Sequence, residues 1–234
     1  MSRISIGAAT MLLTLVCLAT SVESVYANQG GRLLNSCGAN CTMYGSHAAI
    51  RSGVLAPGSG GVAIGFVRSQ SSSTTAHPGV FQAGYYRADH WTAGDCDRPT
   101  VLTYTASFIE WKNSGTSVGS CNVSTTAPPN DSLFSVIRTK DTSGYFWSAF
   151  LNDNRIFSIH ELNWGSGPAF AGGEFASATG QVNVCFGCDP GPLWGYPTAI
   201  SGVGWTDIHG GGTFNDGGLW QIGNAGAAFR AVHQ

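Results

Sequence analysis

Two polar side chains in this chain are of types that could do chemistry together. Gln82 lies in the segment Phe81-Gln82-Ala83-Gly84, and Glu174 follows a pair of glycines at 172 and 173. A carboxylate can take a proton from water as a general base, and an amide can donate a hydrogen bond to the oxyanion that forms when water attacks a carbonyl. A carboxylate and an amide that share one groove are therefore sufficient to hydrolyse a peptide bond.

Strands must position these two side chains, because no long stretch of the sequence shows helical periodicity. The apolar segments are short, rich in β-branched and aromatic residues, and bounded by Gly, Pro, Asn or Ser, which is typical of strands. Many short strands predict an all-β fold, a two-sheet antiparallel β-sandwich. The predicted strands are His47–Leu55, Val62–Arg68, Val80–Arg87, Val101–Trp111, Ser132–Thr139, Tyr145–Leu151, Arg155–Glu161, Ala169–Ala176, Ile200–Asp207 and Ala227–Val232. The predicted loops include Ser114–Asn130 and Gly210–Gly218.

Side chains alternate between the two faces of a strand, so a period of two tells which residues share a face. Gln82 shares its face with Tyr86, and Glu110 shares its face with Phe108. The glycine pair before Glu174 removes neighbouring side chains, which leaves room for a cleft or for close backbone approach. Alternation does not tell a core face from an outward one. The same residues therefore also fit a simpler interpretation, in which they are hydrogen-bonded polar residues that line a sheet.

Three short motifs follow one another along the chain: Phe81 to Gly84, Tyr104 to Trp111 with Glu110 near its end, and Ala171 to Phe175 around Glu174. In this order they resemble the LQTG, Y-x-x-W-Y-E-W and glycine-glycine-glutamate motifs of the fungal glutamic peptidases, the eqolisins. The last segment is also similar to the F-G-G-E segment of neprosin-type plant peptidases, whose first catalytic residue is Glu where this chain has Gln82. The resemblance spans residues 47–176 and implies a lectin-like, concanavalin-like jelly-roll sandwich with a Gln/Glu dyad.

The resemblance implies a catalytic role for three residues. Glu174 is the general base that deprotonates the attacking water and then the acid for the leaving amine. Gln82 orients that water and donates its amide hydrogen to the oxyanion. Glu110 lies near the cleft and acts on Glu174 through its like charge. We expect neither a metal ion nor an organic cofactor, and a protein or peptide as substrate.

The N-terminus is predicted to direct export. Arg3 precedes an apolar run from Gly7 to Ala19, and Val25-Tyr26-Ala27 has residues that a signal peptidase accepts. The run is too short for a membrane-spanning helix, which needs about 20 residues. We therefore predict a signal peptide over residues 1–27, and a single secreted β-sandwich domain over residues 28–234.

Charge is sparse in this chain and argues against several classes of partner. Only 10% of the residues are charged and the net charge is −2, whereas typical domains have about 25% charged residues. No basic patch is present to bind nucleic acid, and no polybasic motif is present to bind a membrane surface. Few carboxylates also mean few native ion pairs to lose in acid, which is compatible with function at low pH.

Six cysteines remain after the predicted cleavage, and an even number in an exported protein favours disulfides. Cys96 and Cys121 flank a predicted strand, and we expect a bridge between them. The other four lie in two close pairs, Cys37 with Cys41 and Cys185 with Cys188. These two pairs also have spacings that suit four thiolate ligands of zinc, although an oxidising compartment favours the disulfides.

Three functions are compatible with these observations. The favoured function is that of a secreted, acid-active, metal-independent glutamic endopeptidase that uses Gln82 and Glu174. The first alternative is a non-catalytic lectin-like module of the same fold that binds a glycan or a surface protein. The second is a structural exported protein whose polar sheet face is solvated. An enzyme requires the Glu174 carboxylate and the Gln82 amide within reach of one water, about 3 Å from each.

Overall fold

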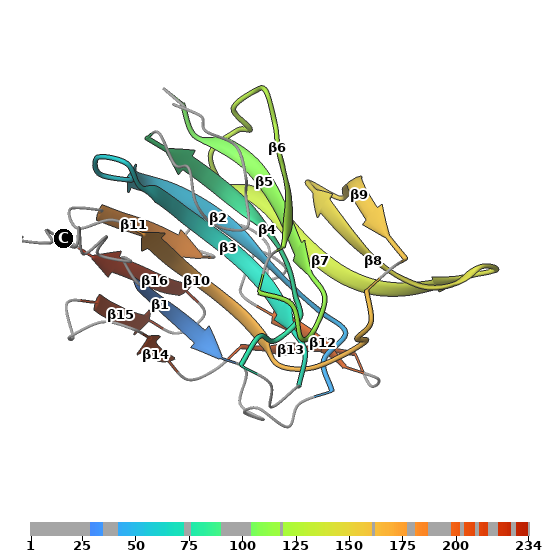
Figure 1. Ribbon diagram of the computed structural model, residues 1–234. Coiled ribbons are helices and arrows are strands. Elements are labelled where there is room, and N and C mark those ends of the chain that lie inside the picture. Colours follow the sequence, from blue (N-terminus) through green and yellow to red (C-terminus); the bar gives the residue numbers. More distant parts are fainter. Residues whose placement is uncertain are drawn as a thin grey trace, which may run out of the picture.

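The computed structural model describes residues 29–34, 42–72, 76–89, 104–117, 119–160, 162–176, 181–186, 198–201, 204–208, 211–214, 220–225 and 228–233. Every regular element among these residues is a strand, and the strands form two antiparallel sheets that lie against each other as layers (Figure 1). The predicted all-β, two-sheet sandwich is therefore confirmed.

One sheet has seven strands and carries the candidate residues. In the order of hydrogen-bonded neighbours, its strands are β14 (Gly211–Phe214), β1 (Gln29–Leu34), β10 (Ala169–Ala176), β3 (Val62–Gln70), β4 (Val80–Ala88), β5 (Ala106–Lys112) and β6 (Ser120–Val123). The strands β3, β4, β5 and β6 are consecutive both in the chain and in the sheet, whereas β10 returns from far along the chain to pair with β3. This return places Glu174 in the same sheet as Gln82 and Glu110, with β3 between its strand and theirs.

The other sheet has nine strands. Seven of them follow the order β15 (Trp220–Ala225), β16 (Ala228–His233), β11 (Gln181–Phe186), β2 (Gly45–Ala56), β7 (Ser132–Asp141), β8 (Gly144–Leu151) and β9 (Asn154–Ile159). The strand β12 (Thr198–Ser201) pairs with β2 and with β13 (Gly204–Asp207). The end of the β7–β8 hairpin extends beyond the body of the sandwich (Figure 1).

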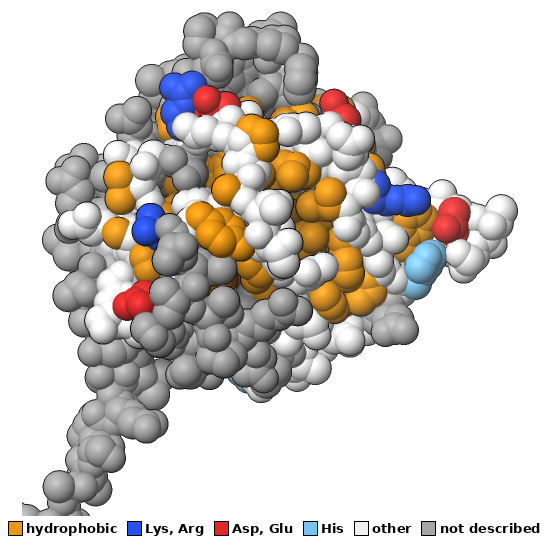
Figure 2. Space-filling view, turned by 90° about the horizontal axis from the view of Figure 1, so that it is seen from above, with side chains coloured by type: hydrophobic (Ala, Val, Ile, Leu, Met, Phe, Trp, Pro, Cys, Tyr) orange, Lys and Arg blue, Asp and Glu red, His pale blue; other side chains and the backbone are white. Residues whose placement is uncertain are grey.

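The two sheets enclose one apolar core between their inner faces. The seven-stranded sheet contributes residues such as Val67, Phe81 and Ile109, and the nine-stranded sheet contributes residues such as Phe134 and Trp147. These core residues recur at every second position of their strands, so the residues between them point away from the core. Charged side chains are few on the face shown in Figure 2, where uncharged side chains cover most of the described surface.

Several strands differ from those predicted. The strands β1, β6, β11, β14 and β15 were not predicted, and the single strand predicted over Ile200–Asp207 is two strands, β12 and β13. The prediction also placed β6 and β14 in loops, which was wrong. Both are four-residue strands at the edges of their sheet, and backbone pairing with one neighbour holds them, so their own side chains give little signal. The predicted strand Val101–Trp111 begins only at Ala106, and residues 101–103 lie outside the described residues.

The cysteine predictions fall mostly outside the described residues. Cys121 on β6 and Cys185 on β11 are disulfide-bonded, but Cys96 is not among the described residues, so the Cys96–Cys121 bridge stays a prediction. Within the described ranges, no group of three or more His, Cys, Asp or Glu is arranged to hold a metal ion. The described part of the chain also has no helix that is long and apolar enough to cross a membrane.

Candidate active site

Three neighbouring strands place Arg68, Gln82 and Glu110 in one row. The strand β3 pairs with β4, and β4 with β5, in a register that sets Arg68 opposite Gln82 and Gln82 opposite Glu110. Residues directly opposite each other in an antiparallel sheet project to the same face. Their chain neighbours Val67 and Phe81 belong to the core, so the row projects from the outer face of the seven-stranded sheet.

Glu174 reaches the same face from β10. It lies opposite Ile64 on β3, four positions from Arg68, so the three residues share one face. The Arg68 side chain bridges the offset along the strand, because its guanidinium carbon lies 4.2 Å from the centre of the Phe66 ring. Gly172 is the register partner of Phe66 and has no side chain that would compete for the space above this ring.

A chain of hydrogen bonds joins the four polar side chains. Arg68 Nε donates to Gln82 Oε1 at 2.5 Å, and Arg68 Nη2 donates to Glu174 Oε2 at 2.8 Å. Gln82 Nε2 in turn donates to Glu110 Oε2 at 2.6 Å. The network therefore has a carboxylate at each end, with a guanidinium and an amide between them.

The neighbours of Gln82 fix the orientation of its amide. A guanidinium has only donors, so it must face the amide oxygen, whereas an ionised carboxylate has only acceptors and must face the amide nitrogen. Arg68 and Glu110 stand on the two sides of Gln82 in this arrangement. One N–H of Gln82 is used by Glu110, and the second N–H of the same nitrogen bonds no described residue.

The network is largely removed from water. Gln82 is 1% exposed, and the side chains of Arg68 and Glu174 are 11% and 10% exposed. Opposite charges attract more strongly in such surroundings than in water, but each is costly to leave alone. Arg68 and Glu174 therefore depend on each other, while the small exposed fraction of both side chains leaves them within reach of a ligand.

Gly84 brings the two central strands together. A Cβ atom at this position would lie 1.9 Å from the carbonyl oxygen of Gly65 on β3, a distance that no side chain can accept. The close approach of β3 and β4 beside Arg68 and Gln82 therefore requires glycine. The glycine of the Phe81–Gly84 motif has this packing role.

Tyr86 lies on the same face, in the same row across the strands as Glu174. Ile64 separates the two, since it pairs with Glu174 on one side and with Tyr86 on the other. Tyr86 is 2% exposed, and its hydroxyl has no hydrogen-bond partner among the described residues. Burial, and to a smaller extent the charge of Glu110, raise the pKa of Tyr86 to about 12. The phenol is therefore neutral at any pH at which the protein would work.

The structure thus brings the three sequence-predicted site residues into one network, although no described hydrogen bond joins Gln82 to Glu174 directly. Arg68 joins them, and it was not among the site residues predicted from the sequence. The available signal was its place in β3, where the outward residues Ile64 and Phe66 are apolar and Arg68 alone is charged. The sequence does not reveal the strand order, so it did not show that Arg68 lies next to Gln82 and Glu174.

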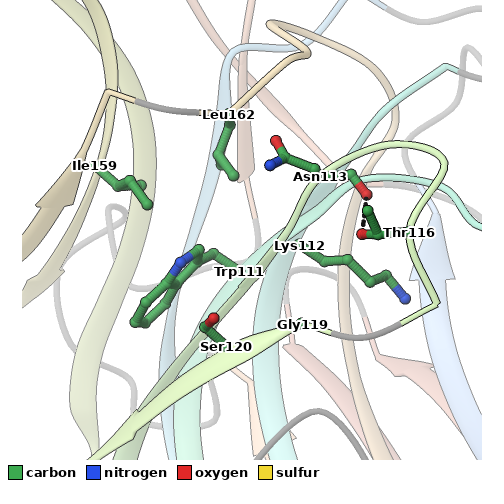
Figure 3. A pocket seen from close by; sticks show the side chains of 8 residues that line it. All are labelled: Trp111, Lys112, Asn113, Thr116, Gly119, Ser120, Ile159 and Leu162. Carbon is green, nitrogen blue, oxygen red and sulfur yellow. Dashed lines mark hydrogen bonds between the residues drawn. The ribbon is translucent and has the colours of Figure 1, made fainter.

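A separate cavity opens on the other face of β5, beside Trp111. Its volume is about 220 Å³, and it is lined by Trp111, Lys112, Asn113, Thr116, Gly119, Ser120, Ile159 and Leu162. Figure 3 shows the Trp111 indole on the side of Ile159 and Leu162, with Asn113 at the rim and the Lys112 side chain extending away from the indole. The cavity therefore combines an aromatic surface with amide and hydroxyl groups.

Reciprocal bonds between two asparagines hold the loops around this cavity. The Asn163 backbone N–H donates to Asn113 Oδ1 at 2.9 Å, and the Ser114 backbone N–H donates to Asn163 Oδ1 at 2.8 Å. The indole of Trp111 packs on Phe157, with ring centres 4.4 Å apart. The shape of the cavity is therefore fixed from both sheets.

Solved structures share the fold, whereas no protein-family model and no curated protein matches the sequence. SCP-B, a member of the eqolisin family of peptidases in a complex with the tripeptide Ala-Ile-His, is 15% identical with a TM-score of 0.55, over 88% of this chain and 98% of that one. Scytalido-glutamic peptidase with a transition state analog inhibitor is 14% identical with a TM-score of 0.54, over the same shares. The same peptidase with a peptide-based transition state analog is 12% identical to this chain, with a TM-score of 0.51. The chain therefore has the fold of the glutamic peptidases.

Proposed function

We propose that this protein is a secreted, acid-active glutamic endopeptidase that needs neither metal nor organic cofactor. The observation that carries the proposal is the convergence of Gln82 and Glu174 on one outer sheet face, in one buried network, within a fold of the glutamic peptidase type. A polar network of this kind is unusual in a chain with so few charges, and buried titratable groups concentrate at functional sites.

Glu174 is the general base of the proposed reaction. One of its oxygens binds Arg68, and the other accepts no hydrogen bond from the described residues, so it can take a proton from an attacking water. The oxygen of that water attacks the scissile carbonyl carbon, and the developing oxyanion accepts the unused N–H of Gln82. The protonated Glu174 then donates to the leaving amine as the carbon–nitrogen bond breaks.

Glu110 is a positioning residue in this scheme. Its bond to Gln82 Nε2 keeps the amide nitrogen on one side and the amide oxygen on the other. Loss of this carboxylate would leave only the bond from Arg68 Nε to hold the amide, and an amide that turned its oxygen toward an oxyanion would repel it. We therefore expect Glu110 to affect turnover through Gln82 rather than through contact with the substrate.

A peptide is the proposed substrate. The neighbouring structures hold a tripeptide in one case and a peptide-based transition state analog in another, and their fold covers 88% of this chain. The proposed mature protein begins after Ala27. The strand β1 begins at Gln29 and pairs with β10, with Gly30 opposite Glu174, so this cleavage would leave the strand next to the site intact.

The decisive experiment is digestion of acid-denatured casein by the mature protein and by its Glu174→Gln variant, over a pH series from 3 to 7. We expect cleavage by the parent protein and none by the variant, because glutamine cannot accept a proton from water. The matched control is Asp131→Asn, which neutralises an ion-paired carboxylate on the other sheet and should leave cleavage unchanged. Equal cleavage by the Glu174 variant, or none by the parent, would refute the proposal.

The cavity beside Trp111 favours a second function, the binding of a sugar. Aromatic rings stack on the apolar face of a pyranose while amides and hydroxyls bond its rim, and Trp111, Asn113 and Ser120 offer these groups. Titration with chito- and cello-oligosaccharides, followed by tryptophan fluorescence, tests this function. A response that Trp111→Ala abolishes would support it, and no response from either protein would exclude these sugars.

A further inference from the structure

We infer that Arg68 is a third catalytic group of the proposed peptidase, whose guanidinium holds the oxyanion together with the amide of Gln82. The inference rests on the proposed function, and it adds a charged donor to a site that the sequence motifs describe as a Gln/Glu pair. It follows from how Arg68 divides its hydrogen bonds, how its side chain is buried, and where its unused donors lie.

Arg68 uses only part of its hydrogen-bonding capacity. A guanidinium has five N–H donors in one plane, and Arg68 gives one from Nε to Gln82 and one from Nη2 to Glu174. The other donors, on Nη1 and Nη2, bond no described residue. They are not sealed inside the protein either, because the side chain is 11% exposed and none of its nitrogens is among the fully buried atoms that lack a partner. The unused donors therefore face a space that a ligand can enter.

The unused donors lie next to the groups that would perform the reaction. The guanidinium bonds the oxygen of the Gln82 amide through Nε and an oxygen of Glu174 through Nη2. A carbonyl that approaches the second N–H of Gln82 and the second oxygen of Glu174 must therefore also approach Arg68. A positive charge at this position favours the transition state over the ground state, because the negative charge on the carbonyl oxygen exists only after water has attacked.

A second arginine, Arg51, forms an ion pair of a different geometry. Arg51 directs Nε and Nη2 to the two oxygens of one carboxylate, that of Asp131, at 2.6 and 2.7 Å. That pair is bidentate and half exposed, with side chains that are 43% and 28% accessible. Arg68 instead joins two different side chains, and its guanidinium carbon lies 4.2 Å from the centre of the Phe66 ring. Arg68 therefore holds its positive charge between an amide and a carboxylate, whereas Arg51 directs both bonds to one carboxylate.

The reaction balances with Arg68 as a permanent cation. Water loses a proton to Glu174 as its oxygen bonds the carbonyl carbon, and the carbonyl π electrons move to the oxygen that Arg68 and Gln82 hold. When the tetrahedral intermediate collapses, these electrons re-form the carbonyl, the carbon–nitrogen bond breaks, and Glu174 returns the proton to the leaving nitrogen. Arg68 neither gives nor takes a proton, since arginine remains charged in proteins.

If Arg68 hinders the reaction instead of assisting it, its removal has the opposite effect on the rate. The Arg68 guanidinium stands between Gln82 and Glu174, and if it merely blocked the position of the attacking water, its removal would raise the rate. The oxyanion role predicts instead that removal lowers kcat and leaves KM almost unchanged, because the contact is made only in the transition state. Loss of one oxyanion donor typically lowers kcat by about 100-fold to 1,000-fold.

The test compares Arg68→Met with Arg68→Lys and with the control Arg51→Met, in the full mature protein. Methionine keeps much of the length and apolar contact of Arg68 but has no charge or donor. Lysine keeps the charge but cannot bridge Gln82 and Glu174 with a planar fork. We expect kcat on a peptide substrate to fall at least about 100-fold for Arg68→Met, to fall less for Arg68→Lys, and to stay constant for Arg51→Met, with circular dichroism unchanged in all three.

Binding of a phosphinic peptide gives a second readout that does not need turnover. The phosphinate is a tetrahedral anion, so it mimics the charge that Arg68 is inferred to hold. We expect Arg68→Met to weaken phosphinate binding at least about 100-fold. The corresponding uncleaved peptide is tested on Glu174→Gln protein, which cannot cleave it. Adding Arg68→Met to that protein should change the peptide's affinity by no more than a few-fold.

The outcomes separate this inference from the function on which it rests. A parent protein that neither cleaves peptides nor binds the phosphinate refutes the proposed function, and the role of Arg68 falls with it. Cleavage that depends on Glu174 but is unchanged or faster in Arg68→Met overturns only the inference. If neither Arg68 variant folds while Arg51→Met does, Arg68 is a structural residue and the inference is likewise overturned.

Discussion

The outer faces of the two sheets carry the same kinds of group in different arrangements. Each has an arginine–carboxylate pair: Arg68 with Glu174 on the seven-stranded sheet, and Arg51 with Asp131 on the nine-stranded sheet. Each also has a buried polar atom without a hydrogen-bond partner among the described residues, the hydroxyl of Tyr86 on one face and Nε2 of His47 on the other.

The difference lies in how much of the hydrogen-bonding capacity is used within the protein. Arg51 and Asp131 are joined by two hydrogen bonds, and both side chains are partly exposed to solvent. Arg68 is shared between two buried partners and has donors left over. A partly exposed bidentate pair uses both oxygens of its carboxylate, whereas a buried network with unused donors has capacity for a ligand. Incomplete satisfaction in a buried place therefore distinguishes the candidate site better than the presence of charges does.

The largest expected effect on stability is that of Arg68→Met. Removing one partner of a buried ion pair leaves the other uncompensated, which typically costs about 3–5 kcal/mol. Urea unfolding at pH 7 should show this loss in the free energy of unfolding, with the protein still folded in buffer. Adding Glu174→Gln to the same chain should recover part of the loss, since the stranded charge is then gone. A double variant that is less stable than Arg68→Met alone would contradict this account of the pair.

The second largest effect concerns pH and comes from the opposite sheet. Burial, opposed in part by the charge of Asp153, lowers the pKa of His47 to about 4, from an ordinary value of 6.5. The unfolded chain therefore binds more protons than the folded chain between these two values, so the free energy of unfolding falls as pH falls through this window. The difference of about 2.5 pKa units corresponds to a loss of roughly 3 kcal/mol by pH 4.

Replacing His47 by Phe should remove this loss. Phenylalanine keeps a ring to stack on Trp205, whose centre lies 4.1 Å from that of His47, and it does not titrate. Thermal unfolding measured from pH 7 to pH 4 should show a smaller decline for His47→Phe than for the parent protein. The exposed His77, changed to Gln, is the control and should leave the slope as it was. Equal slopes for parent and His47→Phe would show that another group causes the acid sensitivity.

The effect of His47 also bears on the proposed activity. An acid-active peptidase must stay folded at its working pH, and the scarcity of carboxylates favours this while His47 opposes it. The His47→Phe variant therefore extends the range over which cleavage can be assayed. Loss of cleavage near pH 4 that His47→Phe restores would be a loss of folded protein and not a property of Glu174.

The sandwich was predictable from the sequence because its apolar segments are short, rich in β-branched and aromatic residues, and bounded by turn residues. Phe81 and Ala83 alternate with Gln82 and Gly84, and the structure places the first pair in the core. That Gln82 and Glu110 share the outward face was not predictable, because it depends on the register of β4 and β5, which the structure supplies. The edge strands β6 and β14 were not predictable in this way, since they are short and pairing holds them in place.

Arg68 marks the limit of prediction for the site. Its face could be read from β3 alone, but its partners depend on β10 lying next to β3, and no local pattern specifies which distant strand completes a sheet. The same limit applies to the orphan hydroxyl of Tyr86. Its burial follows from the packing of Ile64 and Phe108 around it, which is a property of the assembled sheet.

A smaller effect is expected at Tyr86. Its hydroxyl is buried without a described partner, so Tyr86→Phe removes an unsatisfied polar group and keeps the ring that packs near Phe108. We expect a gain of about 1 kcal/mol in the free energy of unfolding, because leaving a buried hydroxyl unpaired typically costs about 1–3 kcal/mol. Differential scanning calorimetry at pH 7 would detect it as a higher melting temperature. A clear loss of stability would mean that the hydroxyl has a partner in solution.

The smallest effect is expected at the partly exposed ion pair of Arg51 and Asp131. Arg51→Met should change the free energy of unfolding by no more than about 1 kcal/mol, because half-exposed pairs are screened by solvent and salt. A double-mutant cycle with Asp131→Asn measures the coupling directly, and the same cycle on Arg68 and Glu174 provides the reference. We expect the second coupling to exceed the first several-fold, and only the first to shrink markedly in 0.5 M NaCl. Equal coupling energies would mean that burial does not make the Arg68–Glu174 pair stronger than the Arg51–Asp131 pair. The two arginines would then differ only in the unused donors of Arg68.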